Sequence, residues 1–217
     1  LQERSLQLAK ESKVRANAGI RKSIIDGVPI SIKDLADIRN ELTKGGSLMI
    51  ESEKAKSDAV FVKNLISNGL IPIGKTHMTE LAFSGLGLNP QTKTPANSLD
   101  STLVPGGSSS GSAVSVSNQL SVASIGSDTG GSVRIPAAWN NLVGLKTTLH
   151  SINLKGVLKL CPSFDTIGPL CKSVQDASAL FSALRNKKIN LLSPLNLRQL
   201  RFLVIKNVFF EKLDQDL

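Results

Sequence analysis

The sequence predicts an α/β fold in which helices and strands alternate along a chain of 217 residues. Between residues 51 and 68, apolar side chains recur at helical spacing, and Gly69 is placed to end this helix as a C-cap. Residues 70–75 then form an apolar run of strand length. A helix followed at once by a strand is typical of a helical layer packed on a sheet.

The N-terminal segments add a helix and a strand to this pattern. Residues 1–18 are predicted to form an amphipathic helix, because apolar residues make a partial stripe among charged ones. The turn at residues 26–29 leads into a short strand whose Ile30 and Ile32 are buried on one face. Lys33 stands at the end of that strand, where a side chain can reach into a cleft.

The other elements follow from the same two periodicities and from the turn residues between them. Residues 84–105 are rich in Gly, Pro and Asn, which predicts a long loop, and loops of this length are usually functional or disordered. The remaining predicted elements are a short helix from Thr76 to Leu81, a helix at 110–118, a buried strand at 120–125, a short helix at 132–140, a core segment at 142–145, a turn or strand at 163–169, a helix at 173–184 and a strand at 200–205.

The composition excludes several classes of protein. Hydrophobic residues are 41% and charged residues 20%, which is ordinary for a soluble globular chain, and the net charge is +9. A basic balance suits a nucleic-acid or acidic partner, but also a solvated Lys/Arg surface. Two cysteines make no disulfide framework, and two separated histidines make no metal site. No apolar run approaches the roughly 18 residues of a membrane helix, so no membrane span is expected.

One stretch concentrates glycine and serine. Residues 105–136 hold six of the 17 glycines and ten serines, including two Gly-Gly-Ser turns at 106–108 and 130–132. Glycine costs backbone entropy, so such clusters indicate positive φ angles or a close approach of the backbone to another group. We expect the two turns to meet in space and to form a catalytic site.

Two familiar glycine–serine motifs fit this stretch incompletely. Gly106 to Gly111 matches the first six positions of a phosphate-binding loop, but Ser112 stands where that loop needs its lysine. Residues 107–111 fit the G-x-S-x-G elbow of α/β-hydrolases with Ser109 as nucleophile. His150 would then be the base, with Asp128 or Asp165 as its acid, yet the segment before the elbow is a weak strand that ends in proline.

A third interpretation is a serine amidase that uses lysine as its base. A serine hydroxyl is a poor nucleophile unless another group takes its proton. Because neither histidine is well placed, lysine is the remaining candidate, and burial can lower its pKa enough for this role. The second Gly-Gly-Ser turn, at a helix start, would supply backbone N–H groups for an oxyanion.

Six segments together resemble the amidase signature family over nearly the whole chain. Each is short, but their combination in this order is highly specific. They are GVPISIKD at 27–34, IGKT at 73–76, PGGSS at 105–109, GSDTGGSVRIPA at 126–137, GLK at 144–146 and SFDTIGP at 163–169.

The resemblance implies a Ser–cis-Ser–Lys triad. Ser132 resembles the nucleophile that accepts the acyl group. Ser108 resembles the serine that follows a cis peptide bond, here with Gly107, and Lys33 resembles the neutral general base.

The resemblance also implies groups that support the triad. Asp128 and Arg134 are expected to organise the site by hydrogen bonds, and Ser109 to cap a turn. The implied oxyanion hole is formed by backbone N–H groups of Thr129, Gly130, Gly131 and Ser132.

The implied fold is the amidase signature fold, a mixed central β-sheet covered by helices on both faces. Family enzymes are longer than this chain. Residues 1–217 are therefore expected to be the N-terminal part of an amidase domain, without the C-terminal half that normally supplies substrate-binding residues and part of the sheet.

Within the family, the sequence is most similar to the A-type glutaminase subunits of glutamyl-tRNA(Gln) amidotransferases, with a fungal mitochondrial form as the expected source. This implies release of ammonia from glutamine, which a complex uses to convert Glu-tRNA(Gln) to Gln-tRNA(Gln). The implied partners are a small third subunit and a B-type subunit, with tRNA bound through the complex. No cofactor is expected in this chain, and ATP and Mg are expected in the partner. The implied location is mitochondrial, although no targeting segment is visible.

Two alternatives remain open. A stand-alone amidase acting on another carboxamide fits, because the half that sets specificity is missing from the sequence. A catalytically inactive, truncated assembly module also fits, although the intact triad argues against it.

Overall fold

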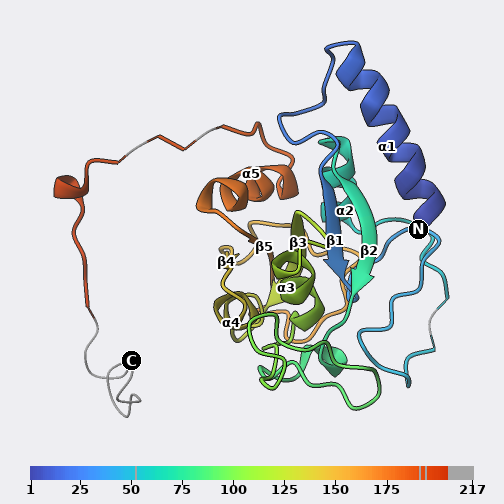
Figure 1. The fold of residues 1–217 in the computed structure, drawn as a ribbon, viewed down its shortest axis with the longest axis vertical. Helices are drawn as coiled ribbons and strands as arrows, with labels where there is room; N and C mark the ends of the chain where they lie inside the picture. Colours follow the sequence, from blue (N-terminus) through green and yellow to red (C-terminus); the bar gives the residue numbers. More distant parts are fainter. Residues whose placement is uncertain (52, 191, 194, 205–217) are drawn as a thin grey trace.

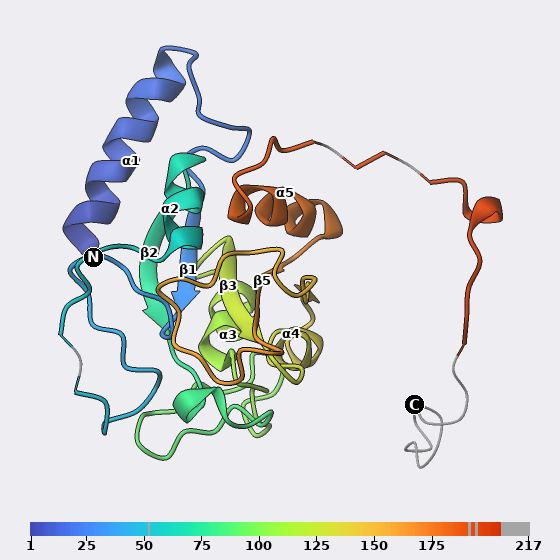
Figure 2. The same ribbon diagram turned by 180° about the vertical axis from the view of Figure 1, so that it is seen from behind.

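The centre of the fold is a five-stranded mixed sheet with the strand order β2-β1-β3-β5-β4 (Figure 1). Helices cover both faces of the sheet, which confirms the predicted α/β class (Figures 1 and 2). None of the helices in the described residues is long and apolar enough to cross a membrane. The computed structural model describes residues 1–51, 53–190, 192–193 and 195–204.

Three strands are parallel and two are antiparallel to their neighbours. β1 (Pro29–Lys33) lies between β2 (Ile71–Thr76) and β3 (Ala123–Asp128) and is parallel to both. β5 (Thr166–Cys171) is antiparallel to β3, and the two-residue β4 (Val143–Gly144) is antiparallel to β5. The carboxyl ends of β1 and β3 therefore meet at the same end of the sheet, next to the start of β5.

The helices pack in two layers and along one edge. α2 (Val60–Ser67) and α5 (Val174–Leu184) pack together on one face of the sheet, and α3 (Ser110–Ser117) covers the other. α4 (Arg134–Trp139) packs beside β4, and α1 (Gln2–Asn17) lies along the edge strand β2 (Figure 1). Two 3₁₀ turns span Glu80–Ala82 and Leu197–Gln199.

The alternation of side chains along β1 separates a hydrophobic core from a polar layer. Ile30 and Ile32 are fully buried in the core that includes α2 and α5. Ser31 faces α3 instead, where its hydroxyl lies 3.0 Å from Ser115 Oγ and donates to Ser124 Oγ at 2.8 Å. Lys33 has the same parity as Ser31, so the strand carries it to the α3 side.

The predicted helix at 51–68 begins only at Val60, so the prediction was wrong at residues 51 and 53–59, while residue 52 lies outside the described residues. The earlier residues bond to distant parts of the backbone. The Ala55 N–H donates to the Glu41 carbonyl at 2.9 Å, and the Ala59 N–H donates to the Asp37 carbonyl at 2.8 Å. Helical periodicity was present, but tertiary hydrogen bonds replaced the helical ones.

The predicted strand at 120–125 lies three residues further on, as β3. Leu120 and Val122 are 70% and 56% exposed because the chain is still leaving α3 there. The register is set by β1, in which Ile30 pairs with Ala123. An apolar run alone does not fix where pairing begins.

Two further predictions were wrong. Thr76 caps no helix, because it ends β2 and its hydroxyl lies 2.8 Å from Ser112 Oγ. Residues 200–204 form no strand, and Ile205 lies outside the described residues. The other predicted helices, at 1–18, 110–118, 132–140 and 173–184, are confirmed with small shifts at their ends.

Gly168 in β5 tests how tightly this sheet is packed. A Cβ placed on Gly168 would lie 1.9 Å from the backbone oxygen of Leu145. We therefore expect Gly168→Ala to lower the free energy of unfolding by about 2 kcal/mol or more, measured by urea denaturation. Gly74→Ala in β2 is the matched control, because a Cβ there meets nothing within 4 Å. Equal losses in the two variants would contradict the packing described here.

Candidate active site

Lys33 is a buried lysine at the carboxyl end of β1. Its side chain is 1% exposed, and its Nζ donates hydrogen bonds to Ser108 Oγ at 2.6 Å and to Ser127 Oγ at 2.8 Å. Burial lowers the pKa of Lys33 to about 7, against the opposing negative charges of Asp128 and Asp165. A substantial share of this lysine is therefore neutral near pH 7, which is what a general base requires.

Ser108 stands at the first glycine–serine turn, directly before α3. The Gly107–Ser108 peptide bond is cis, as the sequence resemblance implied, and Ser108 is fully buried. The turn needs glycine for two reasons. Gly106 has φ +76°, and a Cβ on Gly107 would lie 2.6 Å from the Gly87 nitrogen. This backbone places the Ser108 hydroxyl against Lys33.

Ser132 stands at the second turn, between β3 and α4. It is 8% exposed and lines a cavity of about 520 Å³ together with Thr129, Gly130 and other residues. Within the described part of the chain, no hydrogen bond joins the Ser132 hydroxyl to Ser108. Catalytic hydrogen bonds are often long before substrate binds. The arrangement thus offers one serine held by the lysine and a second serine facing the cavity.

The remaining walls of this cavity come from three segments and are mostly apolar. The loop after the Glu80–Ala82 turn lies on one side, α4 supplies one apolar residue, and the segment before β5 closes another side. The full lining is Ala82, Phe83, Ser84, Gly85, Thr129, Gly130, Ser132, Ile135, Leu160 and Cys161.

Asp128 stabilises the turn that carries Ser132 by hydrogen bonds. Its fully buried carboxylate accepts hydrogen bonds from the N–H groups of Gly131 at 2.8 Å and Val133 at 3.1 Å. The Arg134 guanidinium adds two hydrogen bonds of 3.0 Å each. Burial alone would raise the pKa of Asp128, but the hydrogen bonds from Arg134 and the backbone hold it below its ordinary value. Asp128 and Arg134 therefore hold the turn at Ser132 by hydrogen bonds.

The predicted oxyanion donors are not equivalent. The Gly131 N–H already donates to Asp128 Oδ1, so it is engaged in this structure. Thr129, Gly130 and Ser132 line the cavity, and a Cβ on Gly130 would meet nothing within 4 Å. Their N–H groups are the better candidates to receive an oxyanion.

Ser109 does not cap a turn as predicted, because its side chain bonds elsewhere. It occupies the N-cap position of α3, but its side chain makes no capping hydrogen bond. Its hydroxyl donates to the Ser127 carbonyl at 3.3 Å, and its N–H donates to the Ser132 carbonyl at 3.2 Å. Ser109 thereby ties the two glycine–serine turns together, which confirms that they meet in space.

Sequence reasoning missed the hydrogen bonds that two residues make in the site. Ser127 is the second hydrogen-bond partner of Lys33, and Asp165 accepts a hydrogen bond from the Thr129 hydroxyl at 2.6 Å. Both lie within segments that carry the family resemblance. The available signal was their position, because Ser127 lies near the carboxyl end of β3 and Asp165 directly precedes β5.

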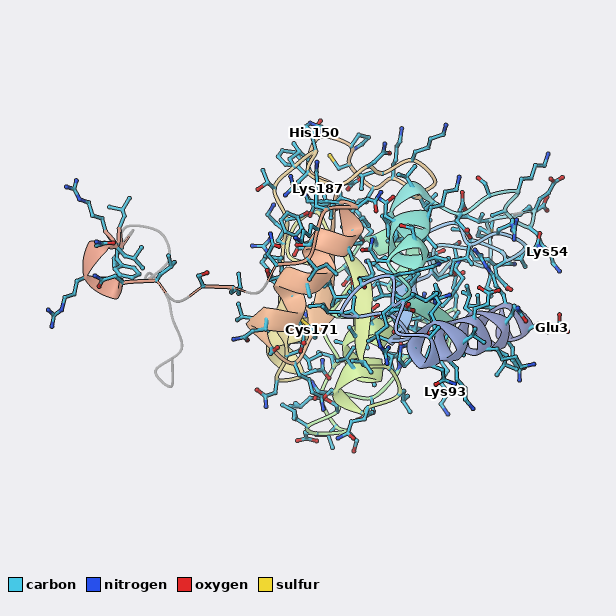
Figure 3. All side chains as sticks on the ribbon, turned by 90° about the horizontal axis from the view of Figure 1, so that it is seen from above. Glu3, Lys54, Lys93, His150, Cys171 and Lys187 are labelled. Atoms are coloured by element: carbon cyan, nitrogen blue, oxygen red, sulfur yellow. The ribbon has the colours of Figure 1, made fainter. Side chains whose placement is uncertain are left out.

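The geometry excludes the elbow interpretation. Ser109 is fully buried, and its hydroxyl donates to a backbone carbonyl. His150, labelled in Figure 3, lines a separate cavity with Asn64, Leu184 and Arg185. The phosphate-loop interpretation also fails, because Ser112 stands at the lysine position of that motif and Ser108 is fully buried against Lys33. Among the described residues, no group of three or more His, Cys, Asp and Glu side chains is placed to hold a metal ion.

The chain is similar to known proteins in sequence and in fold. The model of the Amidase family matches residues 1–204. The A-type subunit of glutamyl-tRNA(Gln) amidotransferase from Anaeromyxobacter dehalogenans is 39% identical over 176 residues, which are 81% of this chain and 36% of the relative.

Solved structures show the same fold. A crystal structure of an amidase superposes with a TM-score of 0.82 at 35% identity, covering 90% of this chain and 45% of that one. The A-type subunit of glutamyl-tRNA(Gln) amidotransferase from Thermotoga maritima has a TM-score of 0.72 at 30% identity, covering 89% and 46%. The chain thus spans little more than a third of the curated relative and less than half of either solved chain.

Proposed function

The chain belongs to the amidase signature family, and on that premise we propose that it is the glutamine-hydrolysing subunit of a tRNA-dependent amidotransferase. The names of its curated relatives support the amidotransferase assignment. The observation that carries the chemistry is the fully buried contact between Lys33 Nζ and Ser108 Oγ, with the Ser132 cavity beside it.

The first half of the proposed reaction transfers an acyl group to the enzyme. Neutral Lys33 takes a proton from Ser108, which takes the proton of Ser132 as its oxygen attacks the carboxamide carbon. The carbonyl oxygen becomes an oxyanion that accepts hydrogen bonds from N–H groups of the turn at Thr129, Gly130 and Ser132. When the tetrahedral intermediate collapses, the C–N bond breaks, the proton returns to the leaving nitrogen, and ammonia departs.

The second half regenerates the serine. Water gives a proton to the same Ser108–Lys33 relay and attacks the ester carbon on Ser132. The C–O bond to the enzyme then breaks, the Ser132 oxygen recovers a proton, and glutamate leaves. Two serines and one lysine account for every proton in both halves, so this reaction needs no cofactor in the chain.

The proposal extends to an assembly. A B-type subunit with ATP and Mg would use the ammonia to amidate Glu-tRNA(Gln), and a small third subunit would complete the complex. The net charge of +9 suits a chain that works next to tRNA. Partners, ATP, Mg and a mitochondrial location rest on the family resemblance alone.

A stand-alone amidase is the second candidate, and two observations favour it. The TM-score to the amidase crystal structure is higher than that to the Thermotoga maritima amidotransferase chain, 0.82 against 0.72. The lining residues of the cavity also include no charged side chain. A wall of this kind contacts neutral parts of a carboxamide more readily than the charged groups of glutamine.

Ammonia release from a panel of amides separates these two candidates. The panel should contain glutamine, asparagine, simple aliphatic and aromatic carboxamides and a peptide amide, assayed with the full-length protein and its subunits. The proposal predicts that glutamine has the highest kcat/KM and that charged acceptor tRNA changes its rate. Preference for an aliphatic or peptide amide would favour the stand-alone amidase, and no hydrolysis of any amide would favour an assembly module.

A further inference from the structure

The carboxylate of Asp165 connects two walls of the Ser132 cavity. Oδ1 accepts the Thr129 hydroxyl at 2.6 Å, and Thr129 belongs to the turn that carries Ser132. The same carboxylate accepts the N–H groups of Leu160 and Cys161, each at 3.0 Å. Leu160 and Cys161 line the cavity on another side. One side chain therefore fixes the spacing between the oxyanion turn and the wall that faces it.

The charge of Asp165 is buried and has no basic partner of its own. Asp165 is 8% exposed, and among the described residues no Lys, Arg or His forms an ion pair with it. Asp128 differs, because Arg134 Nη2 lies 3.0 Å from its Oδ1. These two aspartates are the charged groups that act on Lys33, and the negative charges of both raise the pKa of the lysine against the larger effect of burial.

We propose that Asp165 is a positioning residue of this active site, which holds the Thr129 turn against the Leu160–Cys161 wall and acts on Lys33 through its negative charge. The inference rests on the proposed amide hydrolysis. It assigns Asp165 two separable effects, one through hydrogen bonds and one through charge. A residue needed only for folding would produce neither of them in a folded variant.

Substitutions at Thr129 isolate the hydrogen bond. Thr129→Val removes the hydroxyl that reaches Asp165 but leaves the carboxylate charged and the backbone N–H in place. A hydrogen bond to a charged group corresponds to about a 10- to 100-fold effect, so we expect kcat/KM to fall by about tenfold or more. The acid limb of the pH profile should stay where it is. Thr129→Ser restores the hydroxyl and should recover most of the loss.

Asp165→Asn tests the charge. The negative charge of Asp165 raises the pKa of Lys33 and so opposes the effect of burial. When Asn removes that charge, the pKa of Lys33 should fall further. The base then stays neutral at lower pH, and the acid limb of kcat/KM should move to lower pH. Asp100→Asn is the matched control, because Asp100 is an exposed acid that does not act on Lys33. Its profile should coincide with the wild type.

The experiment is a pH series of ammonia release by the full-length protein with its subunits, for wild type and these four variants, with circular dichroism to confirm folding. An acid limb that stays in place in Asp165→Asn, together with wild-type kcat/KM in Thr129→Val, would overturn the inference while amide hydrolysis stands. If the wild type releases no ammonia from any amide, the proposed function fails instead. If Asp165→Asn does not fold, the Thr129 pair decides the positioning effect, and near-wild-type rates in both of its variants overturn it.

Discussion

Replacing Ser132 by Ala is expected to abolish amide hydrolysis. Ser132 is the serine of the two glycine–serine turns that lines the 520 Å³ cavity. In the proposed reaction its oxygen forms the bond to the acyl group. Without that oxygen, neither Lys33 nor Ser108 has a nucleophile to activate. Loss of a nucleophile typically costs several orders of magnitude, so ammonia release should fall by roughly 10⁴-fold or more. Substrate should still bind with a similar Kd, because the cavity walls are unchanged.

The measurement is ammonia release from the preferred amide by the full-length protein, with binding followed by calorimetry. Ser101→Ala is a suitable control, since Ser101 is exposed in the loop before the first glycine–serine turn. Ammonia release by Ser132→Ala at a tenth of the wild-type rate would show that another group is the nucleophile. Ser109 would be the first to test in that case, although its full burial argues against it.

Replacing Lys33 by Met is expected to have nearly as large an effect on activity. Methionine has a similar length but cannot take a proton from Ser108, so kcat should fall by about 10³-fold. In the wild type, activity should decline as pH falls below the pKa of Lys33, about 7, because the protonated lysine cannot act as a base. The residual activity of Lys33→Met should lack this acid limb. Lys93→Met, at an exposed position, should keep both the wild-type rate and the limb.

The same substitution is expected to increase stability. The pKa of Lys33 lies at about 7 in the folded protein and at about 10.5 when unfolded, so the unfolded state binds more protons between these values. Stability therefore falls as pH decreases from 10.5 to 7 and then stays level. The pKa shift of Lys33 corresponds to a loss of roughly 5 kcal/mol in the free energy of unfolding of the wild type at pH 7. The gain of Lys33→Met is smaller than this, because the substitution also removes the hydrogen bonds to Ser108 and Ser127.

Urea denaturation of both proteins across this pH range measures the difference. Lys33→Met should gain most relative to wild type at pH 7 and below, and the gain should shrink towards pH 10.5. A difference that does not depend on pH would mean that Lys33 titrates normally in the folded protein. In that case the lysine would be largely protonated at neutral pH, and the proposed base would have to be another group.

The sequence predicted those parts of the site that depend on local backbone chemistry. Gly106, Gly107 and Gly131 mark turns in which a side chain would be strained or would clash, and Lys33 ends a strand whose alternation is readable from Ile30 and Ile32. Each of these signals can be read from a few neighbouring residues. The fold class followed in the same way from short apolar runs between turn residues.

What the sequence could not predict depends on long-range contacts. The start of β3 at Ala123 is set by its register with β1, and the absence of helix at residues 53–59 is set by hydrogen bonds to residues 37–41. Asp165 is 33 residues beyond Ser132 in the chain, and its link to Thr129 appears only when β5 is placed beside β3. The hydrogen bond from the Gly131 N–H to Asp128 also depends on the folded geometry of the turn, so the sequence could not show which N–H groups are already occupied.

Covalent labelling of the full-length protein tests the central claim most directly. A fluorophosphonate probe reacts with an activated serine without any choice of substrate, and peptide mass spectrometry then locates the label. The account predicts a label on Ser132 whose rate of formation rises with pH around a midpoint near 7, and whose rate is strongly reduced in Lys33→Met. Labelling of a different serine, or labelling of Ser132 at a rate that is independent of both pH and Lys33, would contradict it.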